Sequence, residues 1–340
     1  MADELRIAVI GLGHWGPNHV RVFNQCRGSR VVVGADPDER RRNWVLAQSS
    51  DLEVVSEAEH ALERPDVDAV VIATPTRTHH ALAKAALEAG KHVLLEKPMC
   101  STVEEAEELV NLARTTDRAL VHGHVFVYNC GIEFVREHAV RGEFGAIQYV
   151  YATRTNLGPI RYDVDVVQDL ATHELAIFDY LFGELPTWVA ANGSRVLGTA
   201  REDVAFVALE YGSGILAHVH VSWLDPQKTR RLTLVGDRRM VVWNDVDPSE
   251  PVRLYDKGVK EEPYYDSFGE FKFALRDADV LIPKIELREP LRRQAEAFVK
   301  RVVEGTPTRS EAESGLRVMR CLDAIETSLV SDGRRCPVPR

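Results

Sequence analysis

The chain has 340 residues, of which 45% are hydrophobic and 28% charged, and its formal net charge is -10 at pH 7. This length predicts about two domains with separate cores. The acidic charge argues against nucleic-acid or anionic-membrane partners, and no apolar run is long enough to span a membrane. The five cysteines are scattered without C-x-x-C spacing. Their pattern favours reduced thiols in a cytoplasmic protein and no metal site.

The first apolar run, Arg6–Ile10, is expected to be a buried strand and leads directly into glycines at the spacing G-x-G-x-x-G. These are Gly11, Gly13 and Gly16, and Asp36 stands twenty residues further on at the end of the next apolar run. In a dinucleotide site the glycines allow a tight turn, close approach of the pyrophosphate and close helix packing. Asp36 would accept hydrogen bonds from ribose hydroxyls and would repel a 2′-phosphate. The carboxylate of Asp36 therefore predicts a preference for NAD over NADP, and the alternative is that the nearby Arg40 or Arg41 accepts a 2′-phosphate.

Up to residue 124 short apolar runs alternate with amphipathic stretches, which predicts a doubly wound parallel sheet of the Rossmann type. The expected strands are Arg6–Ile10, Arg30–Ala35, Glu53–Val55, Asp68–Ala73, His92–Glu96 and Ala119–His124, and the expected helices include His19–Cys26, His79–Ala89 and Glu104–Thr115. Ser101 and Thr102, with glutamates three positions on, indicate a capping box before the last of these helices.

Ligands of such sheets bind beyond the carboxyl ends of the strands. The segment "ATPTRTHH" follows the fourth expected strand, and "LLEKPM" covers the end of the fifth. Lys97 comes directly after that fifth strand, where its cation can stabilise a developing alkoxide. An ordinary surface lysine is an equally weighted alternative.

After residue 125 the pattern changes to helices and strands joined by short turns, such as "YGSG" and "GDRR". We expect an α+β domain with a mostly antiparallel open sheet, and hence a division into residues 1–124 and 125–340. The expected strands are Ala146–Thr155, Trp188–Val196, Val204–Tyr211, Ile215–Trp223, Arg231–Val235 and Met240–Trp243, and the expected helices are Ile132–Arg141, Asp169–Phe182 and most of residues 288–330.

Asp169 and His173 are four residues apart, so they share one face of the expected helix. A histidine can accept a proton near neutral pH, and a carboxylate can orient it. The alternative is a helix cap beside an incidental histidine. A zinc-protease motif is excluded, since it needs a second histidine where Ile177 stands. His218 and His220 alternate along a strand, on a face that is either exposed or part of a subunit interface.

The segments "GLGHWG", "ADPDERR", "ATPTRTHH", "EKPM" and "QDLATHELAIFDYLFG" together resemble the Gfo/Idh/MocA family of oxidoreductases over nearly the whole chain. The resemblance implies NAD as cofactor and a catalytic group of Lys97, Asp169 and His173. It implies a set of cofactor-binding residues, namely Gly11, Gly13, His14, Trp15, Gly16, Asp36, Thr74, Pro75, His79, Glu96 and Lys97. The family commonly has a glycine at the position of Ala171.

"TRTNLGPIRYDVD" resembles the nucleotide-sugar and deoxysugar members and marks Asn156, Arg161 and Tyr162 as candidate substrate contacts. Arg154 and Arg161 flank a glycine–proline bend. The planar donors of an arginine can bind pairs of pyrophosphate oxygens. The resemblance implies hydride transfer between NAD and a ring carbon, C3, of a nucleotide-linked sugar. The alternatives are a free polyol or inositol dehydrogenase, an NAD-dependent glycosidase, and a non-catalytic cofactor-binding regulator.

The resemblance also implies a homodimer or homotetramer joined through the open sheet. A sheet face of mixed apolar and polar residues is costly to leave wholly in water. We expect Phe206, Ala208, Leu216 and Trp223 to join the two histidines on that face.

Overall fold

The computed structural model describes residues 4–340 except 50, 162 and 263–271. Its internal contacts divide the chain into two units. One consists of Met1–Tyr128 with Arg288–Asp323, and the other of Asn129–Leu287 with Ala324–Arg340. The expected division at residue 124 leaves 288–323 in the second domain, whereas in the structure this segment packs with the first.

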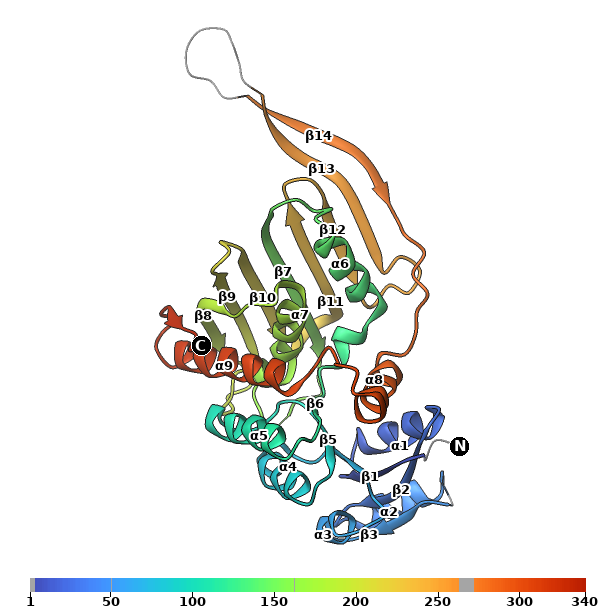
Figure 1. Ribbon diagram of the computed structural model, residues 1–340. Helices are drawn as coiled ribbons and strands as arrows, with labels where there is room; N and C mark the ends of the chain where they lie inside the picture. Colours follow the sequence, from blue (N-terminus) through green and yellow to red (C-terminus); the bar gives the residue numbers. More distant parts are fainter. Residues whose placement is uncertain (1–3, 50, 162, 263–271) are drawn as a thin grey trace. The chain divides into compact units, whose positions relative to one another are not determined.

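The first unit contains a six-stranded sheet in the order β3-β2-β1-β4-β5-β6 (Figure 1). Every adjacent pair is parallel, which confirms the doubly wound parallel sheet. The strands are β1 Leu5–Ile10, β2 Ser29–Ala35, β3 Glu53–Val55, β4 Ala69–Ile72, β5 His92–Leu95 and β6 Leu120–His122.

The helices follow the amphipathic stretches of the sequence, and the first five connect these strands, whereas the last two come later in the chain and the final one belongs to this unit only up to Asp323. They are α1 Gly16–Gln25, α2 Glu39–Leu46, α3 Ala58–Leu62, α4 His79–Glu88, α5 Val103–Thr115, α8 Pro290–Glu304 and α9 Ala312–Leu329, with 3-10 turns at Thr76–Thr78 and Val125–Tyr128. The predicted capping box is present, since the Thr102 hydroxyl accepts from the Glu105 backbone N–H and the Glu105 carboxylate accepts from Ser101.

Helix α8 belongs to the first unit because its apolar face completes that unit's core. Leu291, Ala295 and Phe298 are buried there, and the Phe298 ring meets the edge of Phe23 from α1 with centroids 6.0 Å apart. Apolar spacing predicts this helix, but it does not say which sheet the apolar face will cover.

The second unit contains a nine-stranded sheet in the order β14-β13-β12-β11-β7-β10-β9-β8-β15. The pair β7–β10 is parallel and the other described pairs are antiparallel. The strands are β7 Ile147–Leu157, β8 Pro186–Ser194, β9 Val204–Tyr211, β10 Leu216–Ser222, β11 Leu224–Gly236, β12 Met240–Asn244, β13 Val252–Glu262, β14 Lys272–Leu281 and β15 Cys336–Pro337.

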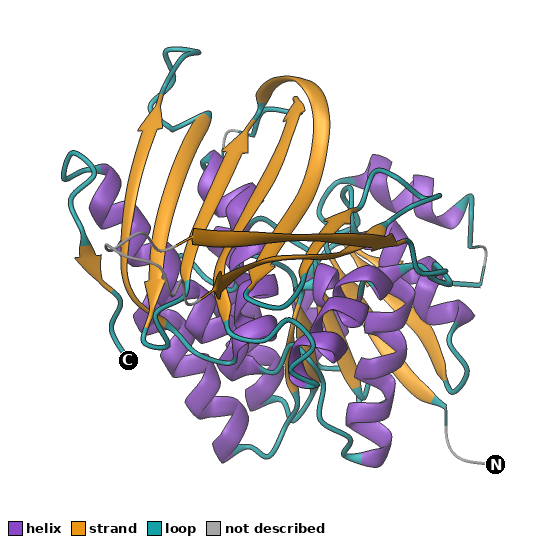
Figure 2. Ribbon diagram, turned by 90° about the horizontal axis from the view of Figure 1, so that it is seen from above, coloured by secondary structure: helices purple, strands orange, loops and turns teal. Residues whose placement is uncertain are grey.

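Two features of this unit differ from the expectation. Strands β13 and β14 form a long hairpin at one end of the strand order, labelled in Figure 1 and seen from above in Figure 2, which the sequence pattern does not reveal. The helix expected from Asp169 begins as a π-helical turn, Val167–Ala171, and becomes α-helical in α7, Thr172–Phe182. The remaining helix, α6, spans Cys130–Val140 and contacts β12.

Candidate active site

The loop after β1 depends on two glycines. Gly11 has a φ of +89°, and a Cβ there would lie 2.6 Å from the carbonyl oxygen of Ala73. A Cβ on Gly16, the first residue of α1, would lie 2.0 Å from the carbonyl oxygen of Gly11. Any side chain at either position would therefore push the backbone apart. The glycines bring β1, α1 and the loop after β4 into the close packing that the motif predicts.

Between these two glycines the loop is open to a ligand. The nearest atom to a Cβ on Gly13 would be the Nη1 of Arg41, 3.7 Å away. Trp15 is the N-cap of α1, is 40% exposed and makes no side-chain capping bond. The backbone N–H groups of the first turn thus have no side-chain acceptor at the cap and can donate hydrogen bonds to phosphate oxygens. The cradle fits a dinucleotide pyrophosphate.

Asp36 directly follows β2 and is a buried, oriented carboxylate. It is only 2% exposed. Its Oδ2 accepts from the backbone N–H of Leu12 at 2.8 Å, and its Oδ1 accepts from that of Asp38 at 2.9 Å. The Nη1 of Arg41 lies 3.4 Å from Oδ2. Backbone groups on two loops thus fix the direction of the negative charge.

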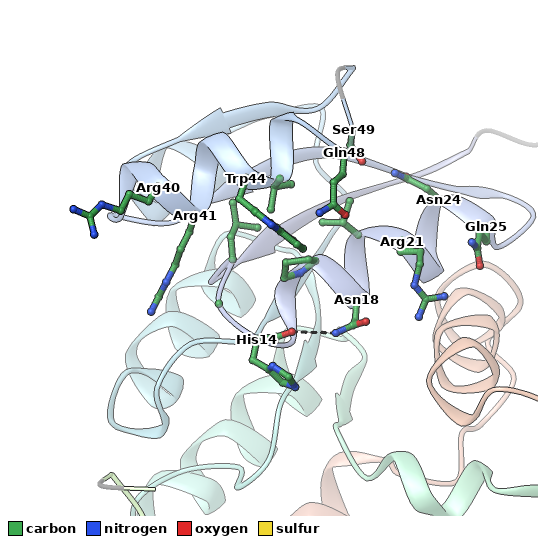
Figure 3. Close-up of a pocket in the computed structure, with 15 residues that line it drawn as sticks. His14, Asn18, Arg21, Asn24, Gln25, Arg40, Arg41, Trp44, Gln48 and Ser49 are labelled. Atoms are coloured by element: carbon green, nitrogen blue, oxygen red, sulfur yellow. Dashed lines mark hydrogen bonds between the residues drawn. The ribbon is translucent and has the colours of Figure 1, made fainter. Parts of the chain in front are cut away.

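A cavity of about 850 Å³ lies beside this loop, between α1 and α2. Figure 3 shows Arg40 and Arg41 extending from α2, and the carbonyl oxygen of His14 accepting from the Asn18 amide at 3.0 Å. The lining residues come from the β1–α1 loop, α1, α2 and the turn after it. None follows β4 or β5, so this cavity flanks the expected cofactor site and does not contain the expected chemistry.

The loops after β4 and β5 are tied together by His79. Its Nδ1 lies 2.9 Å from the carbonyl oxygen of Pro98, and its Nε2 lies 2.9 Å from that of Thr74. Burial lowers the pKa of this imidazole. The ring therefore fastens the Thr74–Pro75 loop to the loop that carries Lys97.

Glu96 and Lys97 follow β5, and Glu96 is held from α1. Its Oε1 lies 2.8 Å from the Nε2 of His19, and its Oε2 accepts from the Lys97 backbone N–H at 3.2 Å. Burial opposes ionisation of Glu96, but the bonds and charges of His19 and Lys97 hold its pKa below the usual range. Sequence reasoning missed His19, although it lies on the buried face of α1 three residues after Gly16.

The second unit holds Asp169 and His173. Asp169 is on the π-helical turn, and His173 is in the first turn of α7 and 9% exposed. Asp165 lies just before this turn, and its Oδ1 accepts from the Gln168 N–H at 2.8 Å. Burial raises the pKa of Asp165. Single π-helical turns inside helices occur frequently at functional sites.

The Asp169 carboxylate accepts from two other parts of this unit. Its Oδ1 accepts from the Nη1 of Arg161, and its Oδ2 accepts from the indole Nε1 of Trp223, each at 3.1 Å. Arg161 also donates from Nε and Nη2 to the two oxygens of Asp163, at 3.0 and 2.6 Å. Trp223 was expected on the open sheet face. Alternation places it on the opposite side from His220, and it is 2% exposed.

The other predicted substrate contacts are placed differently. The Asn156 amide donates to the carbonyl oxygen of Gly158, which closes the bend on itself. Tyr162 lies outside the described residues. Arg154 is buried and forms an ion pair with buried Glu174. Arg154 therefore packs inside the unit, and the expectation that it faces a ligand is not supported.

Comparison with known proteins places the chain in a family. Residues 5–124 match the oxidoreductase family with an NAD-binding Rossmann fold, and residues 132–242 match the GFO/IDH/MocA C-terminal domain. The chain belongs to the Gfo/Idh/MocA family. It is thus an NAD-binding oxidoreductase. The residues of the β1–α1 loop and Asp36 remain its predicted cofactor contacts.

Several known proteins resemble this chain over nearly its whole length. UDP-N-acetylglucosamine 3-dehydrogenase of Acidithiobacillus ferrooxidans is 28% identical over 93% of this chain and 94% of its own. A crystal form of that enzyme superposes with a TM-score of 0.83, covering 97% and 99% of the two chains at 26% identity. GenD2 from gentamicin A biosynthesis, in complex with NAD, shares the fold with a TM-score of 0.83 at 24% identity, over 100% and 98%.

An inositol 2-dehydrogenase of Rhodococcus jostii is 30% identical over 65% of this chain and 63% of its own.

Within the described part of the chain, no three His, Cys, Asp or Glu side chains gather as a metal site requires. Among the described helices none is both long and apolar enough to cross a bilayer.

Proposed function

We propose that this chain is a cytoplasmic NAD(H)-dependent dehydrogenase that acts at C3 of a nucleotide-linked sugar. The proposal is carried by Arg161, a partly exposed arginine that contacts the carboxylate of Asp169 directly. An arginine fork beside the candidate catalytic carboxylate suits a substrate that carries phosphate close to its reacting sugar. The likeness to UDP-N-acetylglucosamine 3-dehydrogenase over nearly both chains supports the same substrate class.

The proposed chemistry divides among three side chains. NAD, when bound, accepts the hydride that leaves the sugar carbon. His173 accepts the proton of the sugar hydroxyl, a step that a placed base typically accelerates by ~10²–10⁴-fold. Lys97 stabilises the negative charge that develops on the oxygen. Asp169 orients the groups around it. Lys97 belongs to the first unit, and Asp169 and His173 belong to the second.

Arg161 keeps donors for a ligand. A guanidinium carries five N–H groups, and the contacts with Asp163 and Asp169 use three of them. The pair with Asp163 is about one-third exposed on both sides, and an exposed pair contributes only about 0–1 kcal/mol. A pyrophosphate can therefore replace Asp163, with Asn156 and Tyr162 as further proposed substrate contacts.

The proposal is tested by following NADH absorbance with UDP-N-acetylglucosamine and NAD⁺. We expect turnover, competitive inhibition by free UDP, and a sharply raised KM for the nucleotide sugar in Arg161→Ala. Lys97→Ala and His173→Ala should each lower kcat by orders of magnitude and leave the Kd for NAD⁺ nearly unchanged. Arg195→Ala is a matched control, since Arg195 also pairs with a carboxylate on this unit's surface.

A free polyol is the second candidate, because inositol 2-dehydrogenases match about two-thirds of the chain. Efficient turnover of inositol or glucose without inhibition by UDP or dTDP would favour it. Sugar release without net NADH would indicate a glycosidase. An inert protein that binds NAD would indicate a regulator.

We further propose that the protein is a homodimer or homotetramer joined through the open face of the second sheet. Adjacent strands present Tyr149, Tyr151, Phe206 and Leu216 there, each between 40% and 52% exposed. On the same face the rings of Phe206 and His220 stack on each other, with centroids 4.4 Å apart. A second copy would remove this aromatic surface from water.

A further inference from the structure

Trp223 stands at the corner between β10 and β11, and its backbone is fixed from two sides. Its N–H donates to the carbonyl oxygen of Asp203 at 2.9 Å, and its own carbonyl oxygen accepts from Gly158 at 2.9 Å. The side chain is only 2% exposed. Neighbouring loops of the same unit therefore fix the backbone of Trp223, and its side chain is packed inside that unit.

The indole N–H and the Arg161 guanidinium both donate to the Asp169 carboxylate. Each donates to a different oxygen at 3.1 Å. Two bonds on opposite oxygens prevent the carboxylate from rotating about its last torsion. An indole N–H and a guanidinium are donors only and do not accept hydrogen bonds in return. Both contacts favour the charged form of the acid over its neutral form.

We propose that Trp223 is a positioning residue that, with Arg161, holds Asp169 as an oriented carboxylate, so that the sugar's proton passes to His173. The inference rests on the proposed function and refines it. A proton on either Asp169 oxygen would weaken the hydrogen bond that this oxygen accepts, because a neutral carboxyl is a poorer acceptor than a carboxylate. Asp169 is thus suited to orientation and charge stabilisation, and His173 is left as the base. In this oxidation the hydroxyl proton goes to His173 while the hydride goes to NAD⁺.

The kinetic test is Trp223→Phe, which keeps an aromatic ring and removes the donor. The matched control is Trp243→Phe, because Trp243 is equally buried in this unit and its Nε1 donates to Asn129 Oδ1 at 3.2 Å. With UDP-N-acetylglucosamine and NAD⁺ we expect Trp223→Phe to lower kcat roughly ten- to a hundredfold, as for loss of a bond to a charged group. KM should change little, and the acid limb of the kcat profile should move to higher pH. Trp243→Phe should leave kcat unchanged.

A double-mutant cycle decides whether Trp223 acts through Asp169. In an Asp169→Asn background, Trp223→Phe should cause no further loss of kcat. An equal loss in both backgrounds, or an unchanged kcat in Trp223→Phe beside an inactive Asp169→Asn, would overturn the positioning role and leave the proposed function intact. If Trp223→Phe does not fold, β-(3-benzothienyl)alanine at this position removes the N–H from a ring of the same shape.

A second readout does not depend on turnover. In ¹⁵N-tryptophan spectra of the full chain, Asp169→Asn should shift the indole N–H resonance of Trp223 and leave that of Trp243 in place. An unmoved Trp223 resonance would overturn the contact. If UDP-N-acetylglucosamine is not turned over, the proposed function fails, and the indole resonance still decides whether Trp223 holds Asp169.

Discussion

Asp36 differs from a surface carboxylate because it cannot turn away from an incoming charge. Two backbone N–H groups fix it and the side chain is buried. Like charges about 4 Å apart repel by roughly 1–4 kcal/mol near a protein surface. We therefore expect kcat/KM to be higher with NAD⁺ than with NADP⁺. Asp36→Ala should lower the ratio of kcat/KM for NAD⁺ to kcat/KM for NADP⁺ by about tenfold. The substitution removes the repulsion, and Arg41 can then bind the 2′-phosphate.

The control for this prediction is Asp38→Asn, two residues away. Asp38 caps α2 by accepting from the Arg40 N–H at 2.9 Å, and asparagine caps a helix about as well. This variant should keep the wild-type cofactor ratio in steady-state assays. Comparable efficiency of wild-type enzyme with both cofactors would contradict the role given to Asp36.

At the scale of elements, the end of β6 carries two buried imidazoles side by side. The rings of His122 and His124 are 4.0 Å apart, and across the described residues no nitrogen of either ring has a hydrogen-bond partner. Burial lowers the pKa of His124 to about 3, and it lowers that of His122 well below the usual value. Both rings are therefore neutral in the folded protein near pH 7.

This pair predicts a loss of stability in mild acid. Below pH 6.5, the ordinary histidine pKa, the unfolded chain binds protons that the folded chain excludes. For His124 the stabilisation is complete above that pH and declines towards pH 3, by about 1.4 kcal/mol per pH unit. His122 adds a loss in the same direction. In thermal unfolding, the Tm of wild type should fall steeply between pH 6.5 and 4.5. His124→Phe should have a shallower slope. His60→Phe, at an exposed position of α3, should keep the wild-type slope, and parallel curves for wild type and His124→Phe would refute the assignment.

Sequence pattern predicts the first sheet closely because its strands are short apolar runs bounded by glycine, proline and charge. The β13–β14 hairpin escapes prediction because Val252–Glu262 mixes charges and a glycine, which hides the period-two alternation. The π-helical turn escapes because it differs from α-helix in backbone pairing and not in composition.

The candidate site is predictable in the same uneven way. Lys97, Asp169 and His173 stand in local motifs, so the chain itself marks them as candidates. His19 and Trp223 act on Glu96 and Asp169 from 77 and 54 residues away. No local spacing in the sequence predicts contacts between residues so far apart in the chain, because only the packed fold brings these donors to their acceptors.

At the scale of the whole molecule, the proposed assembly concerns the open face of the second sheet. Register pairs Tyr149 with Leu216, Tyr151 with His218 and Phe206 with His220, so these residues form one continuous surface on β7, β10 and β9. Partial burial lowers the pKa of both histidines, so they carry little charge at pH 7. Such a surface is suited to pairing with a copy of itself.

We expect light scattering at micromolar concentration to give twice or four times the 38.1 kDa mass of the chain. Phe206→Glu should shift the mass towards the monomer, because it places a charge at the centre of the aromatic surface and burying an unpaired charge is costly. Val140→Glu is the control, since Val140 is 67% exposed at the end of α6. It should leave the mass unchanged. A monomeric wild type would refute the assembly itself. An oligomeric Phe206→Glu would indicate that the interface lies on another surface.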